Sequence, residues 1–204
     1  YRAQHPLITL LHPTRSGDMM QSLVEKYRQG GWLPIFPCWN SYTAAMIGDH
    51  ATAAIGDAYV KGVRNFDIHT AYEAMRKNAF TTPATYAEYA DGMGRRALRS
   101  YLTYGYIPVE DSVKEAYHRQ EQTSRTLEYA YDDFVLAQVA QLLGHTADYD
   151  TLMLRSESFR HVIDPSTGYA NGRHADGRFL SGSHPYTFAS YITEGAPCHY
   201  TWYA

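Results

Sequence analysis

The sequence predicts an all-α domain in which half-exposed helices surround a set of enclosed helices. Helical segments with one apolar stripe alternate along the chain with segments that are apolar nearly all round. Links from an enclosed segment to a half-exposed one are short, whereas links in the other direction are long and aromatic-rich. The 204 residues are 45% hydrophobic and 19% charged, as in a globular protein with one core. We therefore expect one domain over residues 1–204, an incomplete α/α toroid.

The first half of the chain supplies three of the expected helices. After an apolar lead-in over residues 1–11, Ser16 is expected to cap an amphipathic helix that ends at a Gly-Gly pair. A loop with two prolines and several aromatic residues follows over 32–43. Residues 44–63 predict an enclosed helix whose glycines permit close packing. Asp67 is expected to cap the next amphipathic helix.

The second half repeats the alternation. The irregular stretch after residue 80 is expected to contain one helix over 91–104. Residues 123–143 predict a second enclosed helix, and Thr146 is expected to cap an amphipathic helix that reaches about residue 161. Enclosed-helix signals resume near residue 188 and run to 202. This gives about seven helices.

The long loops are expected to meet at one end of the toroid. They would carry Trp39, Asn40, residues 171–178 and Glu194 to a shared mouth. Asn-Gly and Asp-Gly pairs predict a short hairpin near 169–180. Loops on a rigid scaffold commonly form a concave binding site.

The enclosed helices carry few polar groups, which must be hydrogen-bonded or line a cavity. Asp49 and His50 belong to the first helix, and Arg125 can offset the repulsion among carboxylates on the second. Satisfied core groups and sugar-binding groups both remain open interpretations. The carboxylates on the second helix are Glu128, Asp132 and Asp133.

The stretch 191–202 holds the strongest candidate for chemistry. It contains one carboxyl group, Glu194, followed by the aromatic and polar residues His199, Tyr200 and Trp202. Rings around a carboxyl group can favour its protonated form, which a general acid needs. The alternative is an ordinary helix start, capped by Thr193. Both interpretations remain open from these residues alone.

Bulk properties exclude several classes of partner. A net charge of −3 provides no electrostatic footprint for nucleic acid or an anionic membrane. No apolar run approaches the ~20 residues that span a bilayer. The 19 tyrosines suit either helix seams or sugar-lined pockets. The chain has no initial Met or signal peptide and is interpreted as an excerpt of a longer protein. Cys38 and Cys198 are hypothesised to approach each other.

Several motifs in order along the chain resemble the catalytic domain of glycoside hydrolase family 92, the calcium-dependent exo-acting α-mannosidases. The resemblance covers essentially the whole chain, and Thr126-Leu-Glu-Tyr-Ala-Tyr-Asp-Asp133 is its strongest match. The other motifs are Gln29-Gly-Gly-Trp-Leu-Pro34, Met46-Ile-Gly-Asp-His-Ala51, Asp57-Ala-Tyr-Val-Lys-Gly62, Asp164-Pro-Ser-Thr-Gly168, Thr193-Glu-Gly195 and Tyr200-Thr-Trp202.

The resemblance implies a fold, a reaction and partners. It implies part of an (α/α)6 barrel, an N-terminal β-sandwich domain, a C-terminal remainder of the barrel, and secretion or export to the periplasm. The reaction would be hydrolysis of terminal α-mannosides of N-glycans or mannans with inversion, and Glu194 would be the general acid. The catalytic base, and the calcium ligands that can be placed, would lie beyond this chain. No residue of the chain is assigned to metal.

Substrate contacts are expected from residues at the mouth and on the enclosed helices. They are Trp39, Asn40, Asp49, His50, Glu128, Asp132, Asp133, His199 and Trp202. The best motif departs from the family's usual pattern at 196–199, where Cys198 replaces a Trp. This departure favours an alternative, a non-catalytic or differently specific sugar-binding protein on the same toroid. With only half of an acid–base pair present, we expect the 204 residues alone to be inactive.

Overall fold

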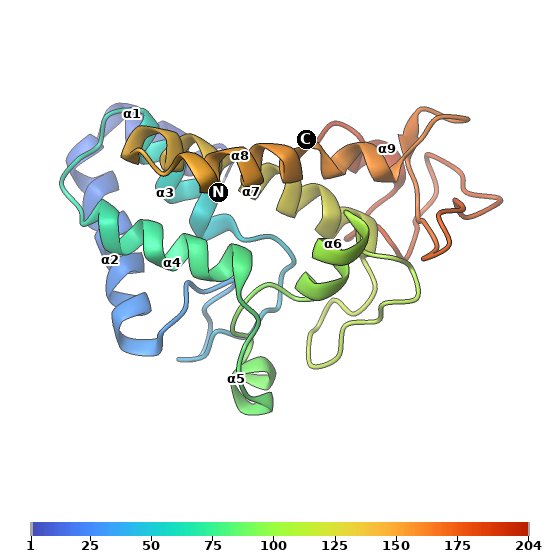
Figure 1. Ribbon diagram of the computed structural model, residues 1–204, viewed down its shortest axis with the longest axis horizontal. Helices are drawn as coiled ribbons and strands as arrows, with labels where there is room; N and C mark the ends of the chain where they lie inside the picture. The colour runs from blue at the N-terminus through green and yellow to red at the C-terminus, as the bar shows by residue number, and fades with distance from the viewer. Residues whose placement is uncertain (1, 204) are drawn as a thin grey trace.

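The computed structural model describes residues 2–203, and its regular secondary structure is almost entirely helical (Figure 1). The described residues form nine α-helices, one 3-10 helix and a two-stranded hairpin. The first helices are α1 (Gln4–Leu11), α2 (Pro13–Gly30), α3 (His50–Val60) and α4 (Ile68–Phe80). The others are α5 (Tyr86–Asp91), α6 (Leu98–Tyr104), α7 (Gln122–Leu143), α8 (Thr146–Ser156) and α9 (Pro197–Tyr200).

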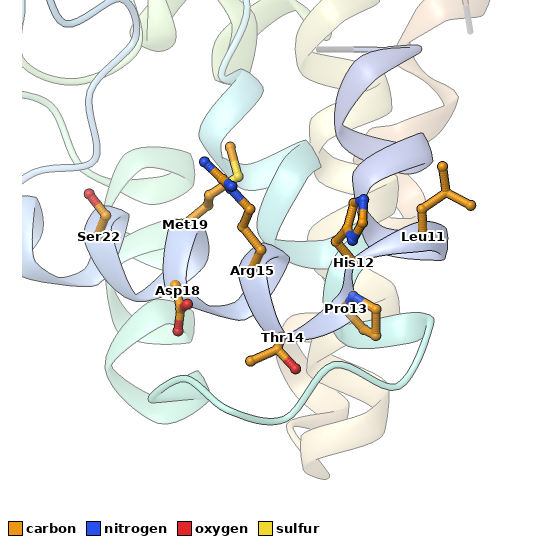
Figure 2. Close-up of a pocket in the computed structure, with 8 residues that line it drawn as sticks. All are labelled: Leu11, His12, Pro13, Thr14, Arg15, Asp18, Met19 and Ser22. Carbon is orange, nitrogen blue, oxygen red and sulfur yellow. The ribbon is translucent and has the colours of Figure 1, made fainter.

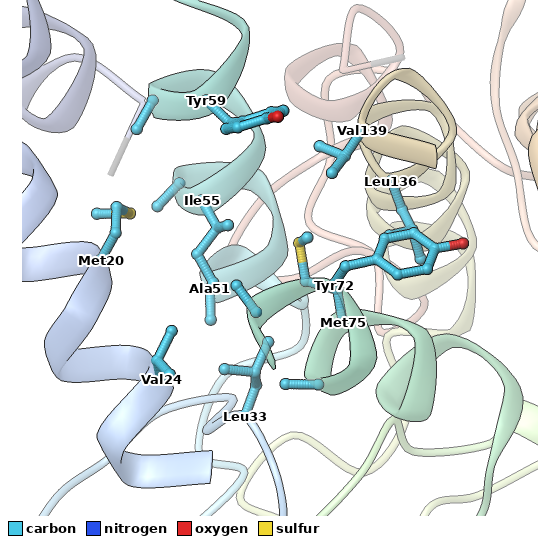
Figure 3. Close-up of a cluster of buried hydrophobic side chains, with 14 of the residues drawn as sticks. Met20, Val24, Leu33, Ala51, Ile55, Tyr59, Tyr72, Met75, Leu136 and Val139 are labelled. Atoms are coloured by element: carbon cyan, nitrogen blue, oxygen red, sulfur yellow. The ribbon is translucent and has the colours of Figure 1, made fainter. Parts of the chain in front are cut away.

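The main core lies between α3 and α7 and the helices that surround them. Side chains of α2, α3, α4 and α7 meet there, as Figure 3 shows. Both enclosed helices are buried along nearly their whole circumference, whereas α2, α4 and α8 each keep an exposed face. At Gly56 of α3, an added Cβ would lie 2.2 Å from Cγ1 of Val135 on α7. The predicted all-α class and the alternation of enclosed and half-exposed helices are confirmed.

Several predicted helix starts are wrong by a few residues. Helix α2 begins at Pro13, and Ser16 lies inside it, where its hydroxyl is hydrogen-bonded to Thr9 at 2.9 Å. Helix α3 begins at His50 rather than near residue 44, because Asp49 occupies its N-cap. His145, not Thr146, precedes α8 as its N-cap. The cap by Asp67 is confirmed, since its carboxylate accepts from the Thr70 N–H at 3.1 Å.

Two stretches are less regular than predicted. The single helix expected over 91–104 is two short helices, α5 and α6, separated by loop residues 92–97. Helix α8 gives way to a 3-10 helix, η1, over Glu157–Val162. The hairpin pairs β1 (Ile163–Asp164) with β2 (Tyr169–Ala170) across a turn. The predicted 169–180 hairpin is reduced to an isolated bridge between Arg173 and Phe179.

The enclosed helix predicted over 188–202 does not form. Only α9 is helical there, and residues 181–196 make turns and bends, seen at the right of Figure 1. The backbone of this segment makes a few turn hydrogen bonds of its own, and its Tyr191 carbonyl accepts from the first turn of α7. Within residues 2–203, no helix is long and apolar enough to cross a membrane.

Candidate active site

The loop over residues 190–196 docks on the N-terminus of α7. The Tyr191 carbonyl accepts from the N–H groups of Thr123 at 3.1 Å and Ser124 at 3.3 Å. A further hydrogen bond joins the loop to the helix, because the Ser124 hydroxyl accepts from the Thr193 N–H at 2.9 Å. The first N–H groups of a helix have no partner within the helix, so the loop satisfies donors that would otherwise be orphaned. This docking anchors the backbone that precedes Glu194 to α7.

Glu194 is held in a left-handed backbone conformation with φ 51°, which is unfavourable for a residue with a Cβ. Such conformations persist where the surrounding structure imposes them, and they concentrate at functional sites. The side chain is 68% exposed, and its Oε1 lies 3.8 Å from Nε2 of His118. A short helix, α9, does begin in this stretch with Pro197 in its first turn, but its N-cap residue is Ala196, so the predicted cap by Thr193 is wrong.

His118 connects Glu194 to a second carboxylate. Its Nδ1 lies 3.1 Å from Oε1 of Glu121, the N-cap residue of α7. The His118 side chain is 7% exposed, so the imidazole is enclosed between a buried and a solvent-facing carboxylate. His118 lies in an irregular loop without periodicity, so no sequence pattern points to it.

Arg95 forms ion pairs with two other carboxylates, Asp49 and Asp133, and we call these three residues the closed cluster. Arg95 donates from Nε to Asp49 at 3.0 Å and from Nη1 to Asp133 at 2.6 Å, and all three side chains are fully buried. Arg155 donates from Nε to the other oxygen of Asp133 at 2.9 Å. Although burial alone would lower the pKa of Arg95, Asp133 and Asp49 raise it above its ordinary value. The guanidinium therefore stays charged.

The carboxylate oxygens of Asp49 and Asp133 accept further hydrogen bonds from neighbouring side chains. Asp49 also accepts from Thr52 at 3.0 Å and from Asn78 at 3.2 Å, and Tyr101 donates to Asp133 at 3.1 Å. Asp49 and Asp133 are thus hydrogen-bonded core groups, and their contact with a sugar stays a prediction. The predicted compensation by Arg125 is also wrong, since Arg125 donates to the carbonyls of Gln120 and His118.

Asp132 differs from its neighbours. Its Oδ2 accepts from the Asp49 N–H at 2.9 Å, but its buried Oδ1 has no hydrogen-bond partner among the described residues. Burial, and next the charge of Asp49, raise the pKa of Asp132 well above its ordinary value. Asp132 is therefore protonated more readily than a solvated carboxyl group.

Glu128 forms a third group, with His50 and Tyr203. Its Oε2 lies 2.9 Å from Nε2 of His50 and accepts from the Tyr203 hydroxyl. An added Cβ at Gly48 would lie 2.4 Å from the same oxygen. Burial, and next the charge of Glu128, raise the pKa of Tyr200 to about 12. His50 also borders a hollow of about 460 Å³ with Phe36 and Pro37. This group retains an opening toward the surface.

The predicted shared mouth is not formed by the described residues. Trp39, which is 90% exposed, and Asn40 border a hollow of about 550 Å³ between α2 and the loop after it, and Glu194 does not border this hollow. Trp39 and Asn40 both have left-handed backbone conformations, with φ 51° and 60°. Trp202 is 83% exposed, and the His199 ring accepts from the Ala196 N–H at 3.0 Å. Substrate contact by these four residues stays a prediction.

A further surface hollow contains none of the predicted site residues. It measures about 850 Å³ and lies over the turn between α1 and α2, between His12, Arg15 and Asp18 (Figure 2). Within residues 2–203 no group of three or more His, Cys, Asp or Glu side chains is arranged to hold a metal ion. Cys38 and Cys198 are both free thiols, so the hypothesised bridge does not form.

Comparison with known proteins places this arrangement in context. The model of the glycosyl hydrolase family 92 catalytic domain matches residues 1–204. An uncharacterized secreted glycosidase of the fungus Arthroderma benhamiae is 29% identical over 178 residues, which are 85% of this chain and 22% of that protein.

Solved structures agree in fold over nearly the whole chain. A family GH92 α-mannosidase of Bacteroides thetaiotaomicron superposes with a TM-score of 0.82 at 34% identity. A family GH92 inverting mannosidase of the same organism superposes with a TM-score of 0.85 at 30% identity. Each match covers 98% of this chain and 25% of the solved chain. The chain therefore spans about a quarter of the length of these relatives.

Proposed function

Because the chain belongs to the glycosyl hydrolase family 92 catalytic domain, we propose that the protein carrying it is an exo-acting α-mannosidase. Its substrates would be terminal α-mannosides of N-glycans or mannans. One similar structure is an α-mannosidase that was also solved in complex with mannoimidazole, and another is an inverting mannosidase. Secretion is proposed because the fungal relative is named a secreted glycosidase.

In this proposal Glu194 protonates the glycosidic oxygen as the sugar leaves. The observation that supports this role is its placement: an accessible carboxyl group on a strained backbone, anchored to α7 on one side. Anchoring the preceding residue, Thr193, restricts where the acid can point, and correct orientation lowers the barrier to proton transfer. Inversion requires a second carboxylate about 6.5–9.5 Å from the acid to activate water. We propose that this base belongs to a part of the protein outside the 204 residues.

Calcium is proposed as the cofactor of the full-length protein from the family alone. The described residues do not fit a calcium site by themselves, because the clustered carboxylates Asp49 and Asp133 are taken by arginine. Calcium requires six to eight oxygen ligands, so further segments would have to supply them. No step of the proposed mechanism is derived through the metal.

Substrate preference is proposed to differ from that of relatives with an unaltered motif. Cys198 lies in α9, where its backbone N–H donates to the Pro185 carbonyl at 3.0 Å. A Cys at this position provides less apolar surface to a sugar ring than a Trp would. The same change supports the alternative, a toroid that binds mannosides without cleaving them.

The test is an assay of the full-length protein with mannobiose and calcium, with Glu194→Gln as the comparison. We expect the substitution to lower kcat by about 10²–10⁴-fold with retained binding, as removal of a general acid does. The sugar released first should have the opposite anomeric configuration to the substrate, measured by NMR. Unchanged turnover in Glu194→Gln would refute the assignment. Binding without turnover in the unsubstituted protein would favour the alternative.

A further inference from the structure

His118 is the described side chain with a carboxylate on each ring nitrogen. Nδ1 lies 3.1 Å from Glu121, and Nε2 lies 3.8 Å from Glu194. Imidazole nitrogens are directional, so a ring fixed at one nitrogen presents the other in a defined direction. The nitrogen presented here faces the proposed general acid.

The ring is held from several sides. Arg125 of α7 donates from Nη2 to the His118 carbonyl at 3.0 Å, and Tyr117 packs edge-on at 5.1 Å between ring centroids. Glu121 is the N-cap residue of α7, where the helix dipole favours a negative charge. Its buried Oε2 has no hydrogen-bond partner among residues 2–203, so Oε1 carries its contact with the imidazole.

Glu194 and His118 reach each other from different parts of the chain. His118 precedes α7, and Glu194 follows from the loop that docks on the same helix end. The charged and titratable groups in contact with His118 are Glu121, Arg125, Tyr117 and Glu194. Because a carboxylate oxygen without a proton only accepts, a ring that donates Nδ1–H to Glu121 and Nε2–H to Oε1 of Glu194 carries a proton on both nitrogens.

We propose that His118, held by Glu121, is a positioning residue for Glu194. It fixes Oε1 and so leaves Oε2 to carry the proton toward the glycosidic oxygen. The 3.8 Å separation closes to a hydrogen bond with a small rotation of the solvent-facing Glu194 side chain. This inference rests on the proposed function, because it assigns a role relative to the acid.

The test compares two substrates of the full-length enzyme. Mannobiose needs a proton on its leaving oxygen, whereas 2,4-dinitrophenyl α-mannoside releases a phenolate that needs none. A defect in the acid therefore slows the first substrate and spares the second. His118→Leu should lower kcat for mannobiose by about 10-fold, since misplacing a catalytic group by 1 Å can cost up to 10²-fold. KM for mannobiose and kcat for the activated substrate should change less than about 2-fold.

Further variants separate positioning from folding. His118→Gln keeps an N–H near the position of Nε2 and should restore most of kcat. Glu121→Gln changes no volume and should lower kcat for mannobiose about 3-fold, so it decides the outcome if His118→Leu does not fold. The control is His69→Leu on the exposed face of α4, which should leave both substrates unchanged.

The outcomes of the two proposals are distinguishable. Glu194→Gln is measured in parallel. Among the variants, it should show the largest difference between the loss of kcat for mannobiose and the loss of kcat for 2,4-dinitrophenyl α-mannoside. If it slows both equally, the proposed function fails. If it shows the difference and the folded His118→Leu and Glu121→Gln variants do not, the positioning role alone is overturned.

Discussion

Two groups of carboxylates lie near α7, and their surroundings are opposite. Asp49 and Asp133 are fully buried, and Arg95 bonds to both. Glu194 lies near the N-terminal end of the same helix with 68% of its side chain exposed, and its Oε1 is 3.8 Å from Nε2 of His118. The carboxylate oxygens of Asp49 and Asp133 all accept hydrogen bonds within the protein, whereas those of Glu194 are accessible to a ligand.

The difference separates a structural cluster from a candidate for chemistry. A buried charge whose oxygens all accept hydrogen bonds cannot also bind substrate without breaking those bonds. An exposed carboxyl group on a strained and anchored backbone gains no comparable stability from its position. Substitutions in the closed cluster should therefore affect folding, and substitutions at Glu194 should affect turnover.

The largest effect on stability is expected from Arg95→Met. Its removal leaves Asp49 and Asp133 buried with less compensation, which should lower the free energy of unfolding by about 3–5 kcal/mol. Urea unfolding of the full-length protein measures the change. The matched control is Arg99→Met, an exposed arginine on α6, which should change it by less than about 0.5 kcal/mol. Equal effects of the two substitutions would show that the closed cluster is not a stabilising unit.

Gly56→Ala tests how tightly α3 must pack against α7. The added Cβ would lie 2.2 Å from Val135, so overpacking should lower the free energy of unfolding by about 1–3 kcal/mol. Gly17→Ala in α2 is the control, because its Cβ would meet only the end of the Asn65 side chain, which can move aside. A neutral Gly56→Ala would indicate that the two enclosed helices can separate freely.

Trp39→Ala tests an open region away from Glu194. The ring is 90% exposed, so stability should be unchanged. If the ring stacks on a sugar, KM should rise about 2–10-fold, since aromatic stacking contributes about 0.5–1.5 kcal/mol. Leu154→Ala on the exposed face of α8 is the control and should not alter KM. An unchanged KM in both variants would remove Trp39 from the predicted substrate contacts.

The smallest effect is expected from Asp132→Asn, and it depends on pH. The pKa of Asp132 is raised above its ordinary value of 3.8 by burial and by Asp49. The folded state therefore holds this proton more tightly than the unfolded state, so stability falls as pH rises above about 4. The asparagine side chain does not titrate, so the variant lacks this loss. The free energy of unfolding of the variant, relative to that of the unsubstituted protein, should therefore be about 1 kcal/mol higher at pH 7 than at pH 4. A parallel pH dependence in both proteins would contradict this.

Periodicity predicted the helices whose packing is regular. Residues 123–143 are apolar on nearly every side and form α7 almost as predicted, with Gly144 after it at φ 80°. Arg95 and His118 were missed because both lie in irregular segments, and only tertiary folding brings them to α7. Local pattern contains no signal for such contacts.

The sequence pointed to the segment around Glu194 as a candidate site, but the helix predicted for its backbone does not form. Its apolar residues suggest an enclosed helix, but the Tyr191 carbonyl bonds to the N–H groups of Thr123 and Ser124 instead of to its own segment. Because these hydrogen bonds join residues far apart in sequence, helix propensity does not decide the local structure. The same bonds hold the loop that carries Glu194 against the N-terminus of α7.

The most direct test measures both properties in two variants of the full-length protein, Glu194→Gln and Asp133→Asn. We predict that Glu194→Gln loses about 10²–10⁴-fold in kcat on mannobiose with an unchanged unfolding transition. Asp133→Asn should lower the free energy of unfolding by about 3 kcal/mol, and the fraction that remains folded should keep its kcat within about 3-fold. Loss of stability in Glu194→Gln with full activity, or loss of kcat confined to Asp133→Asn, would contradict the division between the closed cluster and the open acid.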